Sequence, residues 1–139
     1  MAQPQQQRTS RPLNLLIVDD SAMMRAMIKR AAGLTGVPIG EIYEAANGRE
    51  AIDVLEQHDV DALITDINMP VMSGTELLRA IAPQERYRDL LRVVISTDGS
   101  AARRAEADTL HVRHYVEKPF RPEVMRDVLF ELTVRPDAA

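Results

Sequence analysis

The sequence predicts an α/β fold: a doubly wound, five-stranded parallel sheet with five helices. Short apolar runs alternate five times with amphipathic segments along the 139 residues, and no β-hairpin signal separates one run from the next. This alternation is typical of parallel strands joined by right-handed helical crossovers. The runs are nearly continuous in Leu, Ile and Val, which indicates strands buried on both faces of the sheet.

Each expected strand is a mostly apolar run. The first, "LNLLIVD", is almost uninterrupted, whereas the second, "EIYEAA", is weaker. In chain order the expected strands cover 13–19, 41–46, 61–66, 91–97 and 114–118. Together with the helices that follow them, they make a βα unit repeated five times.

Helix boundaries are marked by capping residues. Ser21 can cap the first helix, whose apolar residues recur at spacings of three and four and so form one buried face. Asn47 and Glu50 form a capping pattern at the start of the second helix, and Pro122 suits the first turn of the last. The expected helices cover 21–36, a segment starting at Asn47, 74–82, part of 100–110 and a segment starting at Pro122.

Composition and termini favour one folded domain over 13–134. The formal net charge is −4 and no basic cluster stands out, which argues against a nucleic-acid partner. The absence of cysteine excludes disulfides and thiolate metal sites and fits a cytoplasmic location. Residues 1–12, polar and without a signal-peptide core, are expected to be a disordered leader, and 135–139 a disordered tail. No apolar run approaches the roughly 20 residues that span a bilayer, so membrane insertion is not expected.

Polar residues with chemical potential stand at the ends of four expected strands. Asp19 and Asp20 end the first, Asp66 the third, Ser96 the fourth and Lys118 the fifth. Each alone has an ordinary explanation as a helix cap, a turn acid, a buried hydroxyl or a surface lysine. However, the carboxyl ends of parallel strands meet at one edge of the sheet, where ligands of open α/β sheets bind. Their joint occurrence therefore favours a binding site.

The acids predict a metal ion and a phosphoryl group at this edge. Carboxylates about 4 Å apart repel by about 4 kcal/mol per pair at an effective dielectric near 20. A divalent cation removes this penalty, and carboxylate oxygens favour Mg²⁺, with Mn²⁺ as the alternative. Because Mg²⁺ usually also binds a phosphate oxygen, Lys118 and the Ser96 hydroxyl are expected to contact a phosphoryl group. Asp66, on a central strand of the expected 2-1-3-4-5 order, is the best-placed nucleophile and would form an acyl phosphate.

Five segments carry a resemblance to a known family. They are "IVDDSAMMR" (17–25), "EAANGREAI" (44–52), "ITDINMPVMSGTELL" (64–78), "VVIST" (93–97) and "YVEKPF" (115–120). In this order and spacing they resemble the receiver domains of two-component response regulators, and within that family the single-domain, chemotaxis-type (CheY-like) proteins. The resemblance covers the chain from Leu13 to about Val134.

The resemblance implies a signalling protein that catalyses its own phosphorylation and dephosphorylation, rather than an enzyme with a separate substrate. A histidine kinase would donate the phosphoryl group of its phosphohistidine to Asp66. Magnesium would be bound by Asp20, Asp66 and the main-chain carbonyl of Asn68, with Asp19 acting through a metal-bound water.

The resemblance also implies a switch. Ser96 matches the switch hydroxyl, and Tyr115 the aromatic residue that moves inward when this hydroxyl approaches the phosphoryl group. Lys118 matches the lysine of a Lys-Pro-Phe motif, and the Lys118–Pro119 bond would be cis. The face formed by the fourth helix, fifth strand and fifth helix (the α4-β5-α5 face of the family) would bind a downstream protein, with chemotaxis as the favoured pathway. The protein is expected to be a monomer.

Two features bear on details within the family pattern. The segment "DTLHVRH" (108–114) lacks the Gly-Ala pair common before the aromatic residue, so the loop after the fourth helix is expected to differ. Asn68 and Asp98 flank the expected phosphoryl position and could orient a hydrolytic water. This predicts self-dephosphorylation on the quick side for the family.

Other functions were weighed against this one. A pseudo-receiver, which binds partners independently of phosphorylation, and a receiver of another phosphorelay stay open, and magnesium-dependent labelling would separate the first from an active receiver. A phosphoaspartyl hydrolase would need an acid two residues after the nucleophile, where the chain has Asn68. A flavodoxin-like carrier would need a hydroxyl-rich phosphate loop, whereas "DDSAMM" would repel the flavin phosphate.

Overall fold

The strands form one parallel sheet in the predicted order. The computed structural model describes residues 7–8 and 11–135. Its central sheet has the order β3-β2-β4-β5-β6, and every neighbouring pair is parallel. Counted along the chain these strands stand in the order 2-1-3-4-5, which confirms the predicted fold class. Their bounds are β2 (Leu13–Val18), β3 (Ile39–Ala45), β4 (Ala62–Thr65), β5 (Leu91–Ser96) and β6 (His114–Glu117).

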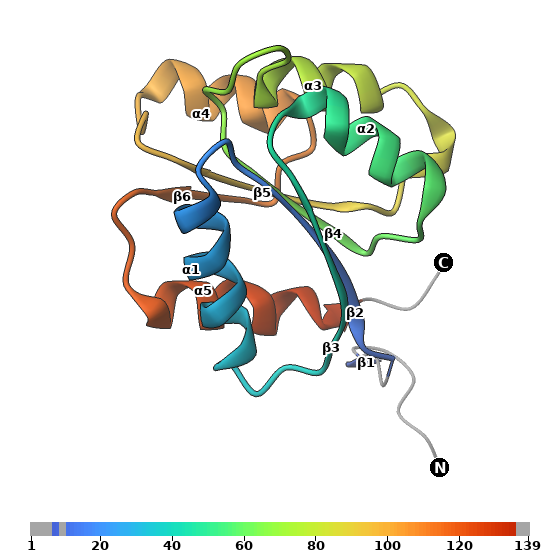
Figure 1. Ribbon diagram of the computed structural model, residues 1–139, viewed down its shortest axis with the longest axis vertical. Helices are drawn as coiled ribbons and strands as arrows, with labels where there is room; N and C mark the ends of the chain where they lie inside the picture. Colours follow the sequence, from blue (N-terminus) through green and yellow to red (C-terminus); the bar gives the residue numbers. More distant parts are fainter. Residues whose placement is uncertain (1–6, 9–10, 136–139) are drawn as a thin grey trace.

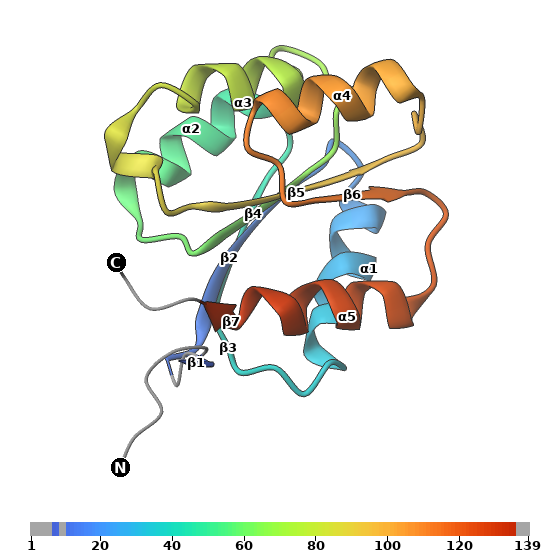
Figure 2. The ribbon, with the colours of Figure 1, turned by 180° about the vertical axis from the view of Figure 1, so that it is seen from behind.

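Helices α1 and α5 cover one face of the sheet, and α2, α3 and α4 cover the other (Figures 1 and 2). The predicted caps are present, because the Ser21 and Asn47 side chains accept hydrogen bonds from backbone N–H groups of the first turns of α1 and α2. No helix within the described residues is long and apolar enough to cross a membrane. The helix bounds are α1 (Ala22–Gly33), α2 (Gly48–Gln57), α3 (Gly74–Ile81), α4 (Ala101–Thr109) and α5 (Pro122–Leu132), with a 3-10 turn at Glu85–Tyr87.

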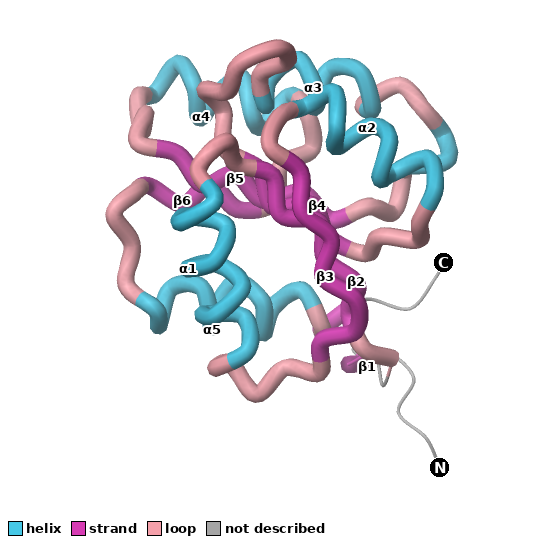
Figure 3. Tube along the Cα trace, in the orientation of Figure 1, coloured by secondary structure: helices cyan, strands magenta, loops and turns pink. Residues whose placement is uncertain are grey.

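Alternate residues of each central strand pack into separate halves of the core. Leu15 and Ile17 of β2 belong to the half under α1 and α5, whereas Leu16 and Val18 belong to the half under α2 and α3. All four are at most 1% exposed. Figure 3 shows the strands enclosed between the two helical layers. A strand buried on both faces needs apolar residues at every position, which explains the continuous runs in the sequence.

Short segments near both termini pair with each other. β1 (Gln7–Arg8) lies antiparallel to β7 (Val134–Arg135), which follows α5. The sequence analysis did not predict this ladder. The expected leader 1–12 and tail 135–139 otherwise fall mainly outside the described residues, and their disorder stays a prediction.

The loop between α4 and β6 makes a tight turn at a residue that is not glycine. His111 has φ of 67°, in the left-handed region that favours glycine. The Val112 N–H donates to the Ala107 carbonyl at 3.2 Å and closes the turn. Histidine tolerates this conformation better than most residues, so the chain can make a tight turn here without glycine.

Candidate functional site

The carboxyl ends of the central strands bring the predicted polar residues to one edge. Asp19 follows β2, Asp66 follows β4, Lys118 follows β6, and Ser96 is the last residue of β5. Lys118 Nζ donates hydrogen bonds to Asp19 Oδ2 at 3.0 Å and to Asp66 Oδ2 at 3.1 Å. These partners are 99 and 52 positions away in sequence, so their meeting depends on the sheet.

Three carboxylates form a cluster beside this lysine. One oxygen each from Asp19, Asp20 and Asp66 lies within 4.8 Å of the other two. Asp19 is buried, Asp66 is partly buried and Asp20 is exposed, so the cluster is open to solvent on one side. The three acids outnumber the neighbouring ammonium of Lys118, and acids this close repel one another. A cluster of hard oxygen ligands with excess negative charge fits a divalent cation such as Mg²⁺.

Asp66 is held in place by backbone contacts. Its Oδ1 accepts a hydrogen bond from the Ile67 N–H at 2.7 Å, and its own N–H donates to the Val18 carbonyl at 2.9 Å. Glycine is required at position 74, because a Cβ on Gly74 would lie 1.9 Å from the Asp66 carbonyl oxygen. The backbone at Gly74 can therefore pass close to the Asp66 carbonyl. The other carboxylate oxygen of Asp66, Oδ2, accepts the hydrogen bond from Lys118.

Lys118 is a permanent cation between two acids. Burial alone would lower the pKa of its ammonium, but hydrogen bonds and charges from Asp19 and Asp66 outweigh burial and raise the pKa above its ordinary value of 10.5. The Lys118 N–H donates to the Ser96 carbonyl at 2.8 Å, which links the ends of β5 and β6. The bond between Lys118 and Pro119 is cis, as predicted.

Arg25 supports the acid loop, although the sequence suggested no role for it. One terminal nitrogen donates to the Asp19 main-chain carbonyl at 2.6 Å, and Nε donates to Glu44 Oε1 at 3.0 Å. The Ser21 N–H donates to Asp19 Oδ1 at 2.9 Å. These contacts hold the loop that carries Asp19 and Asp20. The available sequence signal was the position of Arg25 one helical turn after the capping Ser21.

The predicted switch residues lie on neighbouring strands, Ser96 at the end of β5 and Tyr115 within β6. Ser96 is fully buried, and its hydroxyl oxygen accepts a hydrogen bond from the Asp98 N–H at 3.1 Å. Tyr115 is partly buried, and its hydroxyl donates to the Asp98 main-chain carbonyl. The Asp98 carboxylate accepts a hydrogen bond from the Ser100 N–H at 3.1 Å, which lowers the pKa of that carboxyl. It also lies 3.5 Å from Arg103 Nε, so it is directed to the start of α4.

The loop between β4 and α3 holds Asn68 and a strained residue. Asn68 is exposed two positions after Asp66. Val71 has φ of 69°, although a β-branched side chain is strongly disfavoured there. Its side chain is 81% exposed, so packing against the core does not explain this conformation. Backbone strain of this kind often lies near functional sites.

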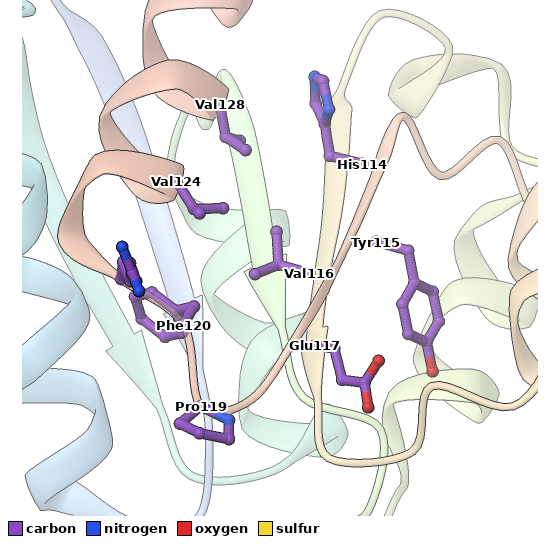
Figure 4. A pocket seen from close by; sticks show the side chains of 9 residues that line it. His114, Tyr115, Val116, Glu117, Pro119, Phe120, Val124 and Val128 are labelled. Atoms are coloured by element: carbon purple, nitrogen blue, oxygen red, sulfur yellow. The ribbon is translucent and has the colours of Figure 1, made fainter.

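A groove of about 520 Å³ lies between β6 and the start of α5 (Figure 4). Figure 4 shows the Tyr115 ring on the opposite side of β6 from Val116. The alternation of the strand thus points Val116 toward α5, whereas the Tyr115 ring, which also borders the groove, lies beside Arg104 of α4. The groove is lined by His114, Tyr115, Val116, Glu117, Pro119, Phe120, Arg121, Val124 and Val128.

Comparison with known proteins gives consistent matches. The family model described as "Response regulator receiver domain" matches residues 15–130. A chemotaxis protein CheY homolog of Campylobacter jejuni is 39% identical over 118 residues, which cover 84% of this chain and 89% of the relative. Chemotaxis protein CheY1 of Helicobacter pylori is 36% identical over 84% of this chain and 94% of the relative. The solved structure of the chemotaxis response regulator CheY4 of Vibrio cholerae is 30% identical with a TM-score of 0.78, and covers 88% of this chain and 99% of that one.

The chain belongs to the response regulator receiver domain family, as its sequence motifs predicted. Receiver domains generally bind Mg²⁺ in an acidic pocket, and Asp19, Asp20 and Asp66 form such a pocket here. Membership implies in general terms a signalling protein with a histidine kinase as phosphodonor and a downstream protein target.

Proposed function

We propose that this protein is a response regulator that accepts a phosphoryl group on Asp66 of its receiver domain from the phosphohistidine of a histidine kinase. The observation that carries the proposal is the contact of Lys118 Nζ with both Asp66 and Asp19 inside a cluster of three acids. An ammonium at hydrogen-bonding distance from the acceptor carboxylate can stabilise the negative charge of a transferring phosphoryl group.

Magnesium would be held by Asp20, Asp66 and the main-chain carbonyl of Asn68, with Asp19 acting through a water; Mn²⁺ suits the same ligands. When bound, the cation would offset the negative charge shared by phosphoryl oxygens and carboxylates. An oxygen of Asp66 forms the new P–O bond while the P–N bond to the imidazole breaks, and the imidazole leaves with its electron pair. Lys118 and the Ser96 hydroxyl contact the phosphoryl oxygens.

The signal is proposed to leave through the face formed by α4, β6 and α5. Movement of Ser96 toward the phosphoryl group changes the space available to Tyr115, which lies between β6 and α4. The groove beside β6 is one surface that a protein partner can use on this face. Because similar proteins are named as chemotaxis proteins, we infer a cytoplasmic chemotaxis response regulator that acts as a monomer.

Labelling with a small phosphodonor tests the acceptor. Wild-type protein incubated with acetyl phosphate and Mg²⁺ is expected to gain one phosphoryl group, and Asp66→Asn none, when intact mass is measured. Asp53→Asn, which removes an exposed acid of α2, is the matched control and should label normally. Stoichiometric labelling of Asp66→Asn would rule out Asp66 as the acceptor.

The same experiment addresses the pseudo-receiver alternative. A phosphorylation-independent binding module would not be labelled in the presence of Mg²⁺. A wild-type chain that stays unlabelled, while a known receiver is labelled under the same conditions, would favour that alternative.

Asn68 and Asp98 are proposed to shorten the phosphoryl lifetime by orienting a water. The Asp98 carboxylate is engaged with Ser100 and Arg103, so it must leave these contacts to take part. Replacing Asn68 and Asp98 together by apolar residues is expected to lengthen the lifetime of the labelled protein. An unchanged or shorter lifetime, measured as phosphate release, would refute this role.

A further inference from the structure

Arg104 of α4 lies over the ring of the switch tyrosine. Its guanidinium carbon is 4.8 Å from the centroid of the Tyr115 ring. Nε donates to the Gly99 carbonyl at 3.2 Å, and a terminal nitrogen lies 3.5 Å from Glu117 Oε1. The guanidinium is therefore held at the start of α4 and at the end of β6 while it covers the tyrosine.

Tyr115 has a second anchor at its hydroxyl. The hydroxyl donates to the Asp98 carbonyl, and the ring packs against the half of the core under α2 and α3. The core, the hydrogen bond and Arg104 thus act on one ring from different directions. None of these contacts involves Asp66 directly, so they stabilise the packed ring in the unphosphorylated protein.

The neighbouring arginine has different partners. Arg103 contacts Asp98 and Glu106, and Glu106 also pairs with Arg79 of α3. Arg103 therefore connects α4 to the loop before it, at Asp98, and through Glu106 to α3. Arg104 instead faces β6. The contact of Arg104 with Glu117 is long and exposed, and such pairs contribute little. The remaining partners of Arg104 are the Tyr115 ring and the main-chain carbonyls of Gly99 and Tyr115, at 3.2 and 3.5 Å, so the guanidinium contacts Tyr115 at both its ring and its backbone.

We propose that Arg104 is a positioning residue that holds the Tyr115 ring against the core and so biases the face formed by α4, β6 and α5 toward the conformation with a packed tyrosine. The effect on partner binding at this face rests on the proposed function, whereas the positioning of the Tyr115 ring by Arg104 does not. An exposed arginine over a ring shifts an equilibrium about two- to five-fold. Loss of Arg104 should lower the ratio of packed to unpacked ring by this factor, and the target affinity of the unphosphorylated protein by at most this factor.

The pKa of the Tyr115 hydroxyl depends on whether the ring is buried. Burial raises its pKa above the ordinary value of 10.0, the charge of Asp98 adds to the rise, and a hydrogen bond with Ser96 and the charges of Arg104 and Arg103 oppose it. If Arg104 contributed only charge, Arg104→Gln would raise the pKa further. If Arg104 positions the ring, the same variant admits water to the ring and the pKa falls toward 10.0, because the burial effect is lost.

The experiment is a pH titration by NMR of the full chain with ring-labelled ¹³C-tyrosine, without phosphodonor or Mg²⁺. Tyr115→Phe assigns the Tyr115 signal among those of Tyr43, Tyr87 and Tyr115. We expect a lower Tyr115 pKa and a shifted resonance in Arg104→Gln, and a smaller change in Arg104→Lys, which keeps the charge. An unchanged or higher Tyr115 pKa in Arg104→Gln would overturn the proposal.

Two variants serve as controls. Arg86→Gln removes the arginine whose guanidinium carbon lies 5.0 Å from the Tyr87 ring centroid, and should move the Tyr87 signal alone. Glu117→Gln keeps Arg104 and removes only its long ion pair. This variant should lower the Tyr115 pKa by much less than Arg104→Gln does, and an equal decrease would contradict a direct role of Arg104. Unchanged Tyr43 signals verify folding in every variant. Labelling of Asp66 is measured separately, so its failure would affect the proposed function and not this titration.

Discussion

The two ends of the sheet handle charge differently. At the amino end, Asp61 is matched by Arg11, whose terminal nitrogens lie 2.7 and 3.1 Å from its oxygens, and it also accepts the Asn14 N–H at 2.8 Å. At the carboxyl end, three acids gather around Lys118. A carboxylate paired with an arginine connects two segments of the chain. A cluster with more carboxylates than cations can bind a further cation. Excess charge, rather than charge itself, distinguishes the functional end.

The largest effect is expected when the cation is removed from the carboxyl end. In Lys118→Met the labelling rate of Asp66 by acetyl phosphate should fall on the order of 100-fold, because a preorganised positive donor is lost. Affinity for Mg²⁺ should rise at the same time, because the ammonium no longer repels the metal. Intact-mass kinetics and calorimetric titration measure the two quantities.

Lys29, the other lysine of the chain, provides the control. It pairs with Glu44 at 3.1 Å on the surface of α1 and β3. Lys29→Met should change the labelling rate by less than about two-fold, since surface pairs are screened. Equal labelling rates in wild type and Lys118→Met would remove the basis for treating the acid cluster as a phosphoryl site.

At the amino end, Asp61→Asn should affect stability and leave the chemistry intact. The variant weakens the Arg11 pair and the hydrogen bond from the Asn14 N–H, so the free energy of unfolding should fall by about 1–2 kcal/mol. Urea unfolding measures this loss, and labelling of Asp66 should proceed at the wild-type rate. A slower labelling rate with unchanged stability would reverse the contrast between the two ends.

Backbone strain is expected to mark the functional end as well. Val71→Asn should raise the free energy of unfolding by about 0.5–1 kcal/mol, because asparagine tolerates positive φ better and no packing is lost from an exposed valine. Val124→Asn makes the same exchange in α5, without positive φ, and should bring no gain. Equal effects of the two variants would argue against strain at Val71.

The smallest effect concerns a matched cluster near the carboxyl end. Hydrogen bonds from Lys29 and Arg25 lower the pKa of Glu44 below 4.5. A lowered folded pKa stabilises the protein above pH 4.5, and this contribution disappears as the pH falls through the folded value. The difference in unfolding free energy between wild type and Glu44→Gln should therefore be largest near neutral pH and shrink in acid. Glu44 is about a third exposed, so screening should keep the difference below about 1 kcal/mol.

The strands and helices of the central fold could be predicted from local sequence patterns. The runs before Asp19 and Asp66 are apolar except at Asn14 and Thr65. Ser21, Asn47 and Pro122 mark helix starts through contacts within one turn. The β1–β7 ladder was not predicted, because a two-residue pairing has no period to recognise. Its partners also lie at opposite ends of the chain, so no local pattern relates them.

The site was predictable to the extent that it follows from strand ends. Asp19, Asp66, Ser96 and Lys118 could be grouped because parallel strands align their carboxyl ends. Supporting residues such as Arg25 could not, since an arginine on a helix surface gives no sign of which main-chain oxygen or ring it will contact.

The sequence by itself determined the type and order of the strands and helices and the residues at the strand ends, because periodicity and capping are local properties. The tertiary structure alone decided which oxygen of Asp66 meets Lys118 and that Arg104 covers Tyr115. Those contacts join segments that are adjacent only after the sheet has formed. They depend on distances and burial that a one-dimensional pattern does not contain.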